Sequence, residues 1–492
     1  MKHWKIIPAL LIVTLLLSSQ AFAGLFSGYK GPHAGPQFHG PKYIFYFIGD
    51  GMGLPVTTAT EHYLAAVQQD DSVSGGVKEV KLTMSSFPVQ GVSTTYANNR
   101  YITGSAAAVT ALACGKKTSI GTIGMDDDGT ATYTNLGELA KAQGRKVGII
   151  SSVSIDHATP AGFYAHVPSR SMYHDIDMQL ANSGFDYFGG GGLKAPEGND
   201  GNALSVAEAN GYTIATTWNE LNSVDPGQKV IAYDANLQDS KALHYEIDRV
   251  RDAENHISLA QFTRRAIELL DGDNGFFIVV EGGKIDWACH ANDAKTAIMD
   301  TIAFDDAIAE AVAFMSRHPE DTLIVVTSDH ECGGMTIGFA NNGYDTDLQL
   351  LEGQTMSFTD FDTWFEDYKS TSSAADIDAT LWGKIQEAFG MSQSDFTDYE
   401  IAKIETAYDN SMGGYTTDYA EEDMLLYGNY EPLTVTLTHV INNKASLAWT
   451  SYSHTGVPVS VLATGACSEN FDGFYDNTDI AKKIAQAMGE SL

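Results

Sequence analysis

Four apolar runs in this chain are each followed closely by chemically active polar side chains. The runs are rich in Ile, Val and Phe, a composition typical of strands buried on both faces of a parallel sheet. They cover residues 43–49, 147–152, 276–282 and 322–328. The stretches 135–143 and 256–270 between them are amphipathic and are predicted to be helices. This alternation predicts an α/β fold with a central, mostly parallel sheet flanked by helices on both faces.

The polar residues after these runs are expected to meet in space. They are Asp50, then His157 and Thr159, then Glu281, Asp286 and His290, and finally Asp329 and His330. In open parallel sheets, ligands bind at the carboxyl ends of the strands, where such residues gather. A single carboxylate there has little meaning, but four separate clusters predict one functional site.

The residue types in these clusters indicate a metal site. Asp286 and His290 are four residues apart, so on a helix both side chains lie on one face and can bind one ion. His454, in the segment SYSHTGVP, adds another imidazole. Zinc sites combine nitrogen and oxygen ligands and keep one position open when they are catalytic. A lone Asp or His is usually a surface or capping residue, so the prediction depends on the whole set.

Ser105 is the candidate nucleophile. Small residues and good helix formers follow it in GSAAAVTALACG, which predicts a helix that begins at this serine. Free backbone N–H groups and the positive end of the helix dipole would there favour an anionic phosphate. An ordinary helix-capping serine is the commoner role for such a residue. No GxSxG sequence surrounds Ser105, so activation by a metal is the available route.

Several segments together resemble the alkaline phosphatase family, in order and in spacing. They are FIGDGMG, TGSAAAVTALACG, HATPAGFYAHVPSR, FGGGG (188–192), EGGKIDWACH, TSDHECGG and SHTG. The resemblance covers roughly residues 42–340 and 445–485. It implies hydrolysis of phosphate monoesters at alkaline pH through a phosphoserine at Ser105. Transfer of the phosphate to an acceptor alcohol is an expected side reaction.

The resemblance also implies a role for each site residue at two zinc ions and one magnesium ion. The first zinc would take Asp286, His290 and His454. The second would take Asp50, Asp329, His330 and the Ser105 oxygen. Magnesium would take Asp50, Thr159, Glu281 and, less clearly, His157. Arg170 would hold two phosphate oxygens, which a planar guanidinium does well.

Three positions depart from the pattern of the well-known enterobacterial form. Gly104 replaces an Asp that helps to hold the arginine, so we expect Arg170 to be more mobile. His157 replaces an Asp, as in animal enzymes, which affects the geometry at magnesium. Trp287 replaces a Lys, which removes a positive charge near the phosphate, and a Trp at this position resembles some marine bacterial members. Trp287 could equally pack against the core.

The four cysteines do not point to a zinc cluster. Cys114, Cys289, Cys332 and Cys467 are widely spaced, without a CxxC motif. Cys289 and Cys332 flank the proposed ligands His290 and His330. They could be thiol ligands, although the family uses none there. We expect buried free thiols or disulfide partners, and the sequence does not choose between these.

The chain is predicted to be exported. Residues 1–23 have the charged start, short apolar run and Ala-x-Ala ending of a signal peptide cleaved after Ala23. Residues 24–41 are interpreted as a loose leader, and 42–492 as the catalytic domain. An acidic subdomain is predicted to be inserted at about 340–450, although length alone also allows two domains. The mature protein would then be periplasmic or secreted, with no membrane anchor.

Charge and motifs narrow the partners and the alternative functions. The chain has 29 Lys+Arg against 63 Asp+Glu, a formal charge of −34, which disfavours nucleic-acid partners. Small phosphate monoesters are the expected substrates, and the family resemblance implies a homodimer. Sulfatases need a maturation motif that SAAAV does not provide, whereas weak diesterase activity is compatible with the site. An exported phosphate- or metal-binding protein that has lost catalysis is the alternative from another class.

Overall fold

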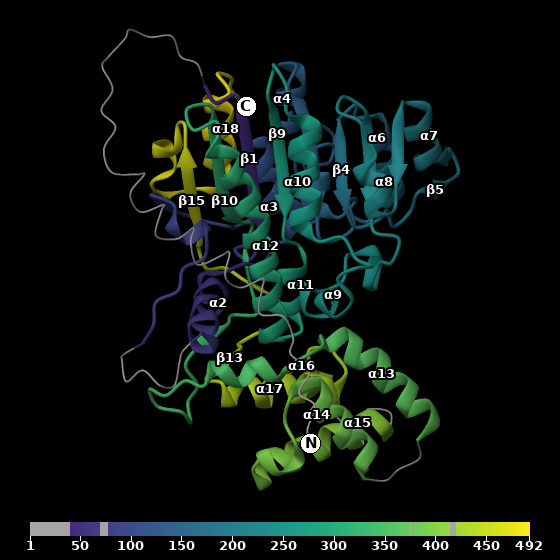
Figure 1. The fold of residues 1–492 in the computed structure, drawn as a ribbon, viewed down its shortest axis with the longest axis vertical. Coiled ribbons are helices and arrows are strands. Elements are labelled where there is room, and N and C mark those ends of the chain that lie inside the picture. The colour runs from purple at the N-terminus through teal and green to yellow at the C-terminus, as the bar shows by residue number, and fades with distance from the viewer. Residues whose placement is uncertain (1–39, 69–76, 373–375, 414–419) are drawn as a thin grey trace, which may run out of the picture. The chain divides into compact units, whose positions relative to one another are not determined.

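The computed structural model describes residues 40–68, 77–372, 376–413 and 420–492, so the predicted signal peptide and most of the leader lie outside the described residues. One sheet dominates the described chain (Figure 1). Its strands are β1 (Tyr43–Gly49), β2 (Val89–Ser93), β3 (Lys146–Ser151), β4 (Tyr187–Gly190), β7 (Tyr212–Ala215), β8 (Lys229–Tyr233), β9 (Phe276–Glu281), β10 (Thr322–Ser328), β15 (Val459–Gly465) and β16 (Gly473–Tyr475). Their order is β16-β2-β15-β10-β1-β9-β3-β4-β8-β7.

The sheet is mostly parallel, as the sequence predicts. Strand β15 pairs antiparallel with both β10 and β2, and the other neighbours in the sheet run parallel. The four predicted apolar strands are β1, β3, β9 and β10, each within one residue of its predicted bounds. Every residue of β1, β9 and β10 is buried, which explains why these strands are apolar throughout instead of alternating.

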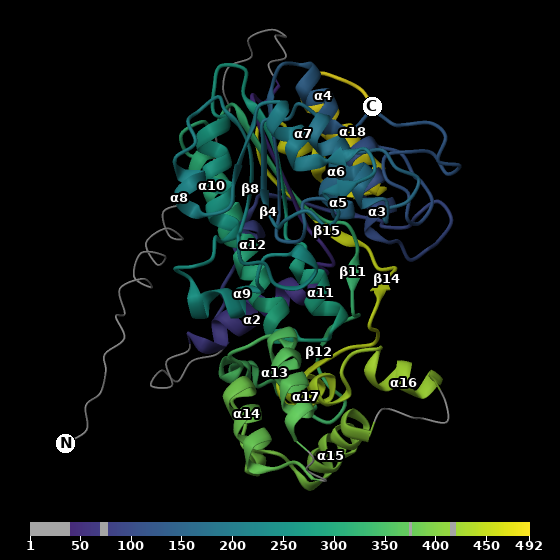
Figure 2. The same cartoon turned by 90° about the vertical axis from the view of Figure 1, so that its right-hand side faces the viewer.

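Helices cover both faces of the sheet (Figure 2). On one face, α10 (Leu259–Leu270) packs on β3 and β4, and α12 (Ala294–Met315) packs on β1 and β10. The opposite face carries α4 (Leu136–Ala142) and α5 (Ala158–Ala161) on β3 and β9. Beside α5 lies α3 (Ser105–Cys114), which packs on α18 (Asn477–Ala487). The remaining helices of this part are α2 (Leu54–Val67), α6 (Tyr173–Asn182), α7 (Ala203–Ala209), α8 (Trp218–Asn222), α9 (Glu246–Arg249) and α11 (Lys284–His290).

Capping explains where the two predicted helices differ from the observed ones. Helix α10 begins at Leu259, not at residue 256, because the Ser258 side chain accepts a hydrogen bond from the Gln261 backbone and forms a capping box. Asn135 caps α4 in the same way through Glu138. None of the described helices is long and apolar enough to cross a membrane.

The region predicted as an insertion is mainly helical. It contains α13 (Phe358–Thr371), α14 (Ala379–Phe389), α15 (Asp398–Gly413), α16 (Ala420–Tyr427) and α17 (Pro432–Lys444). These helices lie beyond α11 at the carboxyl edge of β9 (Figure 1). The short strands β12 (Thr336–Ile337) and β13 (Leu447–Ala448) pair with each other and bring the two ends of the region together. That it forms a separate subdomain stays a prediction.

Candidate functional site

Strand register brings the predicted residues to one edge of the sheet. Gly49 is the partner of Ser328, and Glu281 is the partner of both Ile48 and Ser151. The residues that end or follow these strands therefore project from the same edge. Gly51 has a φ of +68°, and a Cβ on it would lie 2.7 Å from Asp286 Oδ1. Only glycine therefore lets the turn after Asp50 approach α11 this closely.

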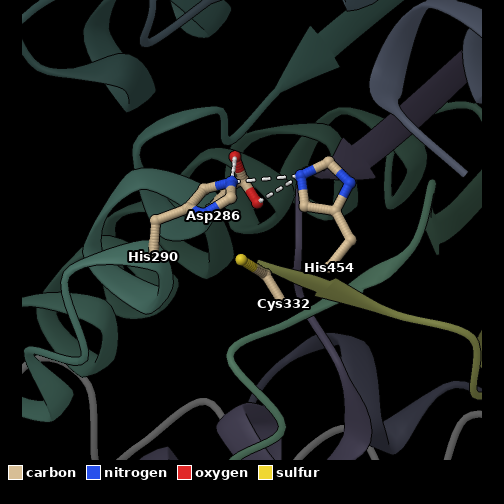
Figure 3. Close-up of side chains that lie close together, drawn as sticks. All are labelled: Asp286, His290, Cys332 and His454. Carbon is tan, nitrogen blue, oxygen red and sulfur yellow. Dashed lines mark hydrogen bonds and ion pairs between the residues drawn. The ribbon is translucent and has the colours of Figure 1, made fainter. Parts of the chain in front are cut away.

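Asp286, His290 and His454 lie together, with the Cys332 thiol beside them, in the first of three neighbouring groups (Figure 3). His290 Nε2 lies 3.3 Å from Asp286 Oδ2 and 3.1 Å from His454 Nε2. The Nδ1 atoms of the two histidines lie 2.6 Å and 2.8 Å from the carbonyl oxygens of Tyr452 and Thr103. A carbonyl only accepts, so each Nδ1 carries a proton, and each Nε2 is directed at the centre of the group, where it would bind a cation in its deprotonated form.

The second group consists of Asp50, Asp329 and His330, next to Ser105. His330 Nε2 lies 3.5 Å from Asp50 Oδ1, 3.1 Å from Asp329 Oδ2 and 3.4 Å from the Ser105 hydroxyl. Asp329 Oδ1 accepts hydrogen bonds from the backbone N–H groups of Gly51 and His330, which fixes the carboxylate. Burial lowers the pKa of His330 well below its usual value, so its ring is neutral and can act as a ligand.

The third group consists of Asp50, His157 and Glu281, all buried. Ser151 donates a hydrogen bond to Glu281 Oε2, and Thr159 lies buried in the first turn after His157. The Arg170 guanidinium lies 2.8 Å from His157 Nε2. Burial, and then the charge of Arg170, lowers the pKa of His157 well below its usual value. This ring is therefore neutral too.

Ser105 is the first residue of α3, as the sequence predicts. Its N-cap is Gly104, and no side chain caps the helix. The first N–H groups of a helix have no partner within it, so these donors are available to an anion beside the serine. Arg170 lies close enough to lower the pKa of His330 and His454 as well as that of His157. Its charge therefore acts across all three groups.

Trp287 faces the third group. Its ring lies 5.8 Å from the ring of His157, and the ammonium groups of Lys284 and Lys194 lie 5.0 Å and 6.0 Å from it. Trp287 is half-buried, so it borders the site instead of filling the core. Of the two sequence interpretations of this residue, the geometry favours the one beside the site.

The buried polar atoms of the three groups fit divalent cations. Eight of them have no hydrogen-bond partner among the described residues: both oxygens of Asp50, Thr159 Oγ1, His157 Nδ1, Glu281 Oε1, Asp286 Oδ1, Asp329 Oδ2 and His330 Nδ1. Orphaned buried polar groups are costly and need an ion or water as a partner.

Burial and the adjacent carboxylates raise the pKa of Asp50 far above its usual value. Burial raises the pKa of Glu281 to about 8 and that of Asp329 to about 7. Cations would allow all of these carboxylates to ionise.

Some side chains that hold the site were not predicted from the sequence. Lys284 is fully buried in the first turn of α11, 2.5 Å from Asp239 and over the ring of Tyr245. After His290, Asn292 donates to the Ser451 carbonyl, and His439 and Asn442 of α17 bond to Asn292. Lys284 at the start of α11 could have been noticed in the sequence as a charged residue near Asp286. Its partner Asp239 could not, because it is distant in sequence.

Comparisons with known proteins identify the family of this chain. The model of the family "Alkaline phosphatase" matches residues 41–187 and 194–489. "Alkaline phosphatase 3" of Bacillus subtilis is 30% identical over 499 residues, covering 98% of each chain.

Two solved structures extend the comparison. The cold-active alkaline phosphatase of a psychrophilic Shewanella is 29% identical with a TM-score of 0.74, covering 90% of this chain and 98% of that chain. A variant of the TAB5 alkaline phosphatase, with a histidine replaced by glutamate and Mg bound in its M3 site, is 25% identical with a TM-score of 0.62. It covers 93% of this chain and 100% of that chain. Since the family model matches almost the whole described chain, this protein belongs to the alkaline phosphatase family.

Proposed function

We propose that this protein is a metal-dependent alkaline phosphatase that hydrolyses phosphate monoesters through a phosphoserine on Ser105. One observation carries the proposal. The Ser105 hydroxyl lies at an uncapped helix N-terminus, 3.4 Å from His330, beside buried carboxylates and imidazoles without partners of their own. A nucleophile, an anion-binding helix end and a metal-ligand set at one place are what phosphoryl transfer requires.

We propose two zinc ions and one magnesium ion for the three groups. The first group offers two imidazoles and one carboxylate, and the second offers one imidazole and two carboxylates, both of which suit zinc. The third would hold magnesium through Asp50, Glu281 and Thr159, with His157 beside it. When bound, these cations would supply Lewis-acid stabilisation to the attacking and leaving oxygens of an in-line displacement.

The residues of the chain would then act in two displacements. In the first, Ser105 loses its hydroxyl proton as Oγ bonds to phosphorus, the ester P–O bond breaks, and the leaving oxygen takes up a proton and departs as the alcohol. The N–H groups at the start of α3 and the Arg170 guanidinium hold the phosphoryl oxygens. In the second, water bonds to phosphorus and the P–Oγ bond breaks, which releases phosphate and restores the serine. An alcohol in place of water would give the predicted transfer reaction.

Location, assembly and domain boundaries complete the proposal. We propose that residues 1–23 direct export and are cleaved after Ala23, and that 42–492 form the catalytic domain with an inserted subdomain at about 340–450. The family resemblance supports a homodimer. Mass spectrometry of the mature N-terminus checks the cleavage after Ala23. Sedimentation equilibrium of the exported protein checks the homodimer.

The first test is hydrolysis of 4-nitrophenyl phosphate at about pH 9–10 by the metal-stripped protein, before and after addition of zinc and magnesium. We expect activity only with metals. The Ser105→Ala variant should lose roughly 10³-fold or more in kcat, because no other group can form the covalent intermediate. Ser316→Ala, which changes an exposed serine at the end of α12, is the matched control and should retain activity.

Two results would count against the proposal. Metal-loaded protein without activity would favour a binding protein that has lost catalysis. Full activity in Ser105→Ala would rule out the phosphoserine route. A phosphoserine identified at Ser105 by acid quench and peptide mass spectrometry would support that route directly.

A further inference from the structure

A buried thiol belongs to the first metal group. One ligand atom from each of Asp286, His290, Cys332 and His454 lies within 4.8 Å of the corresponding atoms of the other three (Figure 3). Cys332 is fully buried, and none of the four cysteines forms a disulfide. Its sulphur therefore faces the two imidazoles and the carboxylate from inside the protein.

Backbone pairing fixes the thiol in this position. Cys332 belongs to the short strand β11 (Glu331–Cys332), which pairs antiparallel with β14 (His454–Thr455). Cys332 is the direct partner of His454, so their side chains lie on the same face. The other pair of this ladder, Glu331 and Thr455, joins through a hydrogen bond between side chains on the opposite face. The pairing therefore keeps the Cβ of Cys332 on the side of the ladder that carries His454.

The group also has an unused ligand atom that points to a missing ion. Asp286 is 4% exposed, and its Oδ1 has no hydrogen-bond partner among the described residues. The Nε2 atoms of His290 and His454 face each other at 3.1 Å, and the backbone carbonyls already bind the other nitrogen of each ring. Two imidazole nitrogens and an unpartnered carboxylate oxygen beside a thiol form a set that a cation would satisfy.

We propose that Cys332 is a fourth protein ligand at the first metal position, so that a thiophilic cation such as Zn²⁺ binds there through one carboxylate, two imidazoles and one thiolate and takes the reacting oxygen as a fifth ligand. The inference rests on the proposed metal-dependent function and adds a ligand that the resemblance to the family does not supply. Thiolates favour Zn²⁺ and disfavour Mg²⁺. Cys332 would therefore make this position selective for soft cations, while the oxygen-rich third group remains suited to a hard one.

Cobalt substitution tests the proposal without relying on activity. The metal-stripped protein is titrated with Co²⁺, whose spectrum contains a thiolate-to-metal charge-transfer band only when sulphur is a ligand. We expect this band in the wild type and in Cys289→Ser, and its loss in Cys332→Ser. Cys289 is the matched control because it is a buried thiol next to His290 but outside the ligand group. The zinc affinity of Cys332→Ser should fall at least about tenfold in competition titrations.

Other results would overturn the assignment. Co²⁺ bound by the wild type without the band, or a band that disappears only in Cys289→Ser, excludes Cys332 as a ligand. Cadmium-113 NMR of the wild type needs no variant, because a sulphur ligand moves the resonance far downfield of that of a nitrogen and oxygen site. A phosphatase that is active with zinc but lacks both signatures would refute the thiolate and leave the proposed function standing. A protein that neither binds metal nor hydrolyses esters would refute both.

Discussion

His157 is the residue at which the third group differs most from an oxygen-rich magnesium site. It lies beside Asp50 and Glu281, but its Nε2 is occupied by Arg170, so only Nδ1 is left for an ion. Magnesium prefers carboxylate and water oxygens to imidazole nitrogen. The affinity of this chain for magnesium should therefore be limited by one side chain.

Replacement of that side chain should strengthen magnesium binding. In His157→Glu, a hard carboxylate replaces the imidazole, and we expect magnesium affinity to rise roughly tenfold. Titration calorimetry of the zinc-loaded protein with Mg²⁺ measures the effect, and His157→Gln serves as the control of similar size without the charge. Equal Mg²⁺ affinity in all three proteins would mean that His157 lies outside the site.

Among the secondary-structure elements, the sequence predicts best those that have a clear local pattern, such as a continuous apolar run. The strands β1, β3, β9 and β10 are continuous apolar runs, and the candidate ligands follow each of them, so the fold and the place where these residues gather could be predicted together. The pairing of Cys332 with His454 joins residues 122 positions apart through strands of two residues each. Such short strands have no detectable periodicity. The contacts of α17 with Asn292 could not be predicted either, because no local sequence pattern indicates them.

The helices of residues 358–444 contain a carboxyl that links their stability to pH. Asp362 of α13 is half-buried and accepts a hydrogen bond from Thr434 of α17. Burial, and the nearby Glu431, raise the pKa of Asp362 to about 7. The protonated carboxyl thus contributes stability that is complete below about pH 4 and is lost as the pH rises through about 7.

Asp362→Asn cannot ionise and should escape this loss. We expect its melting temperature, relative to the wild type, to be on the order of 1–2 °C higher at pH 8 than at pH 5. Thermal unfolding of metal-loaded protein at the two values measures the difference. Asp367→Asn, which changes an exposed carboxyl of the same helix, should show no such dependence. A larger gain at pH 5 than at pH 8 would contradict the assigned direction.

At the scale of the whole molecule, the buried carboxylates make folding depend on metal. Asp50, Glu281 and Asp329 cannot all ionise without cations, because burial and mutual repulsion raise their pKa values. Cations that bind only the folded state add stability by mass action. Free metal at 100 times its dissociation constant would add about 2.7 kcal/mol for each site.

Removal of metal should therefore lower the unfolding temperature as well as abolish activity. We expect EDTA-treated protein to unfold at a lower temperature. Addition of zinc and then magnesium should restore its stability. The gain from metals should be smaller at pH 5, where protons occupy the same carboxylates. Differential scanning calorimetry at pH 5 and pH 8 measures the gain in unfolding temperature from metals, with excess Na⁺ as the control for ionic strength. Identical curves with and without EDTA would show that the carboxylates are tolerated without ions.

The same cluster of carboxylates has a consequence for the life of an exported chain. If the chain is exported and folds outside the cell, it must collect its cations from the surroundings before its centre can close. Until then it is exposed to extracellular proteases, which attack open chains. An organism that scavenges zinc from shared surroundings would thus deprive its neighbours of the enzyme itself, through degradation, and not only of its activity.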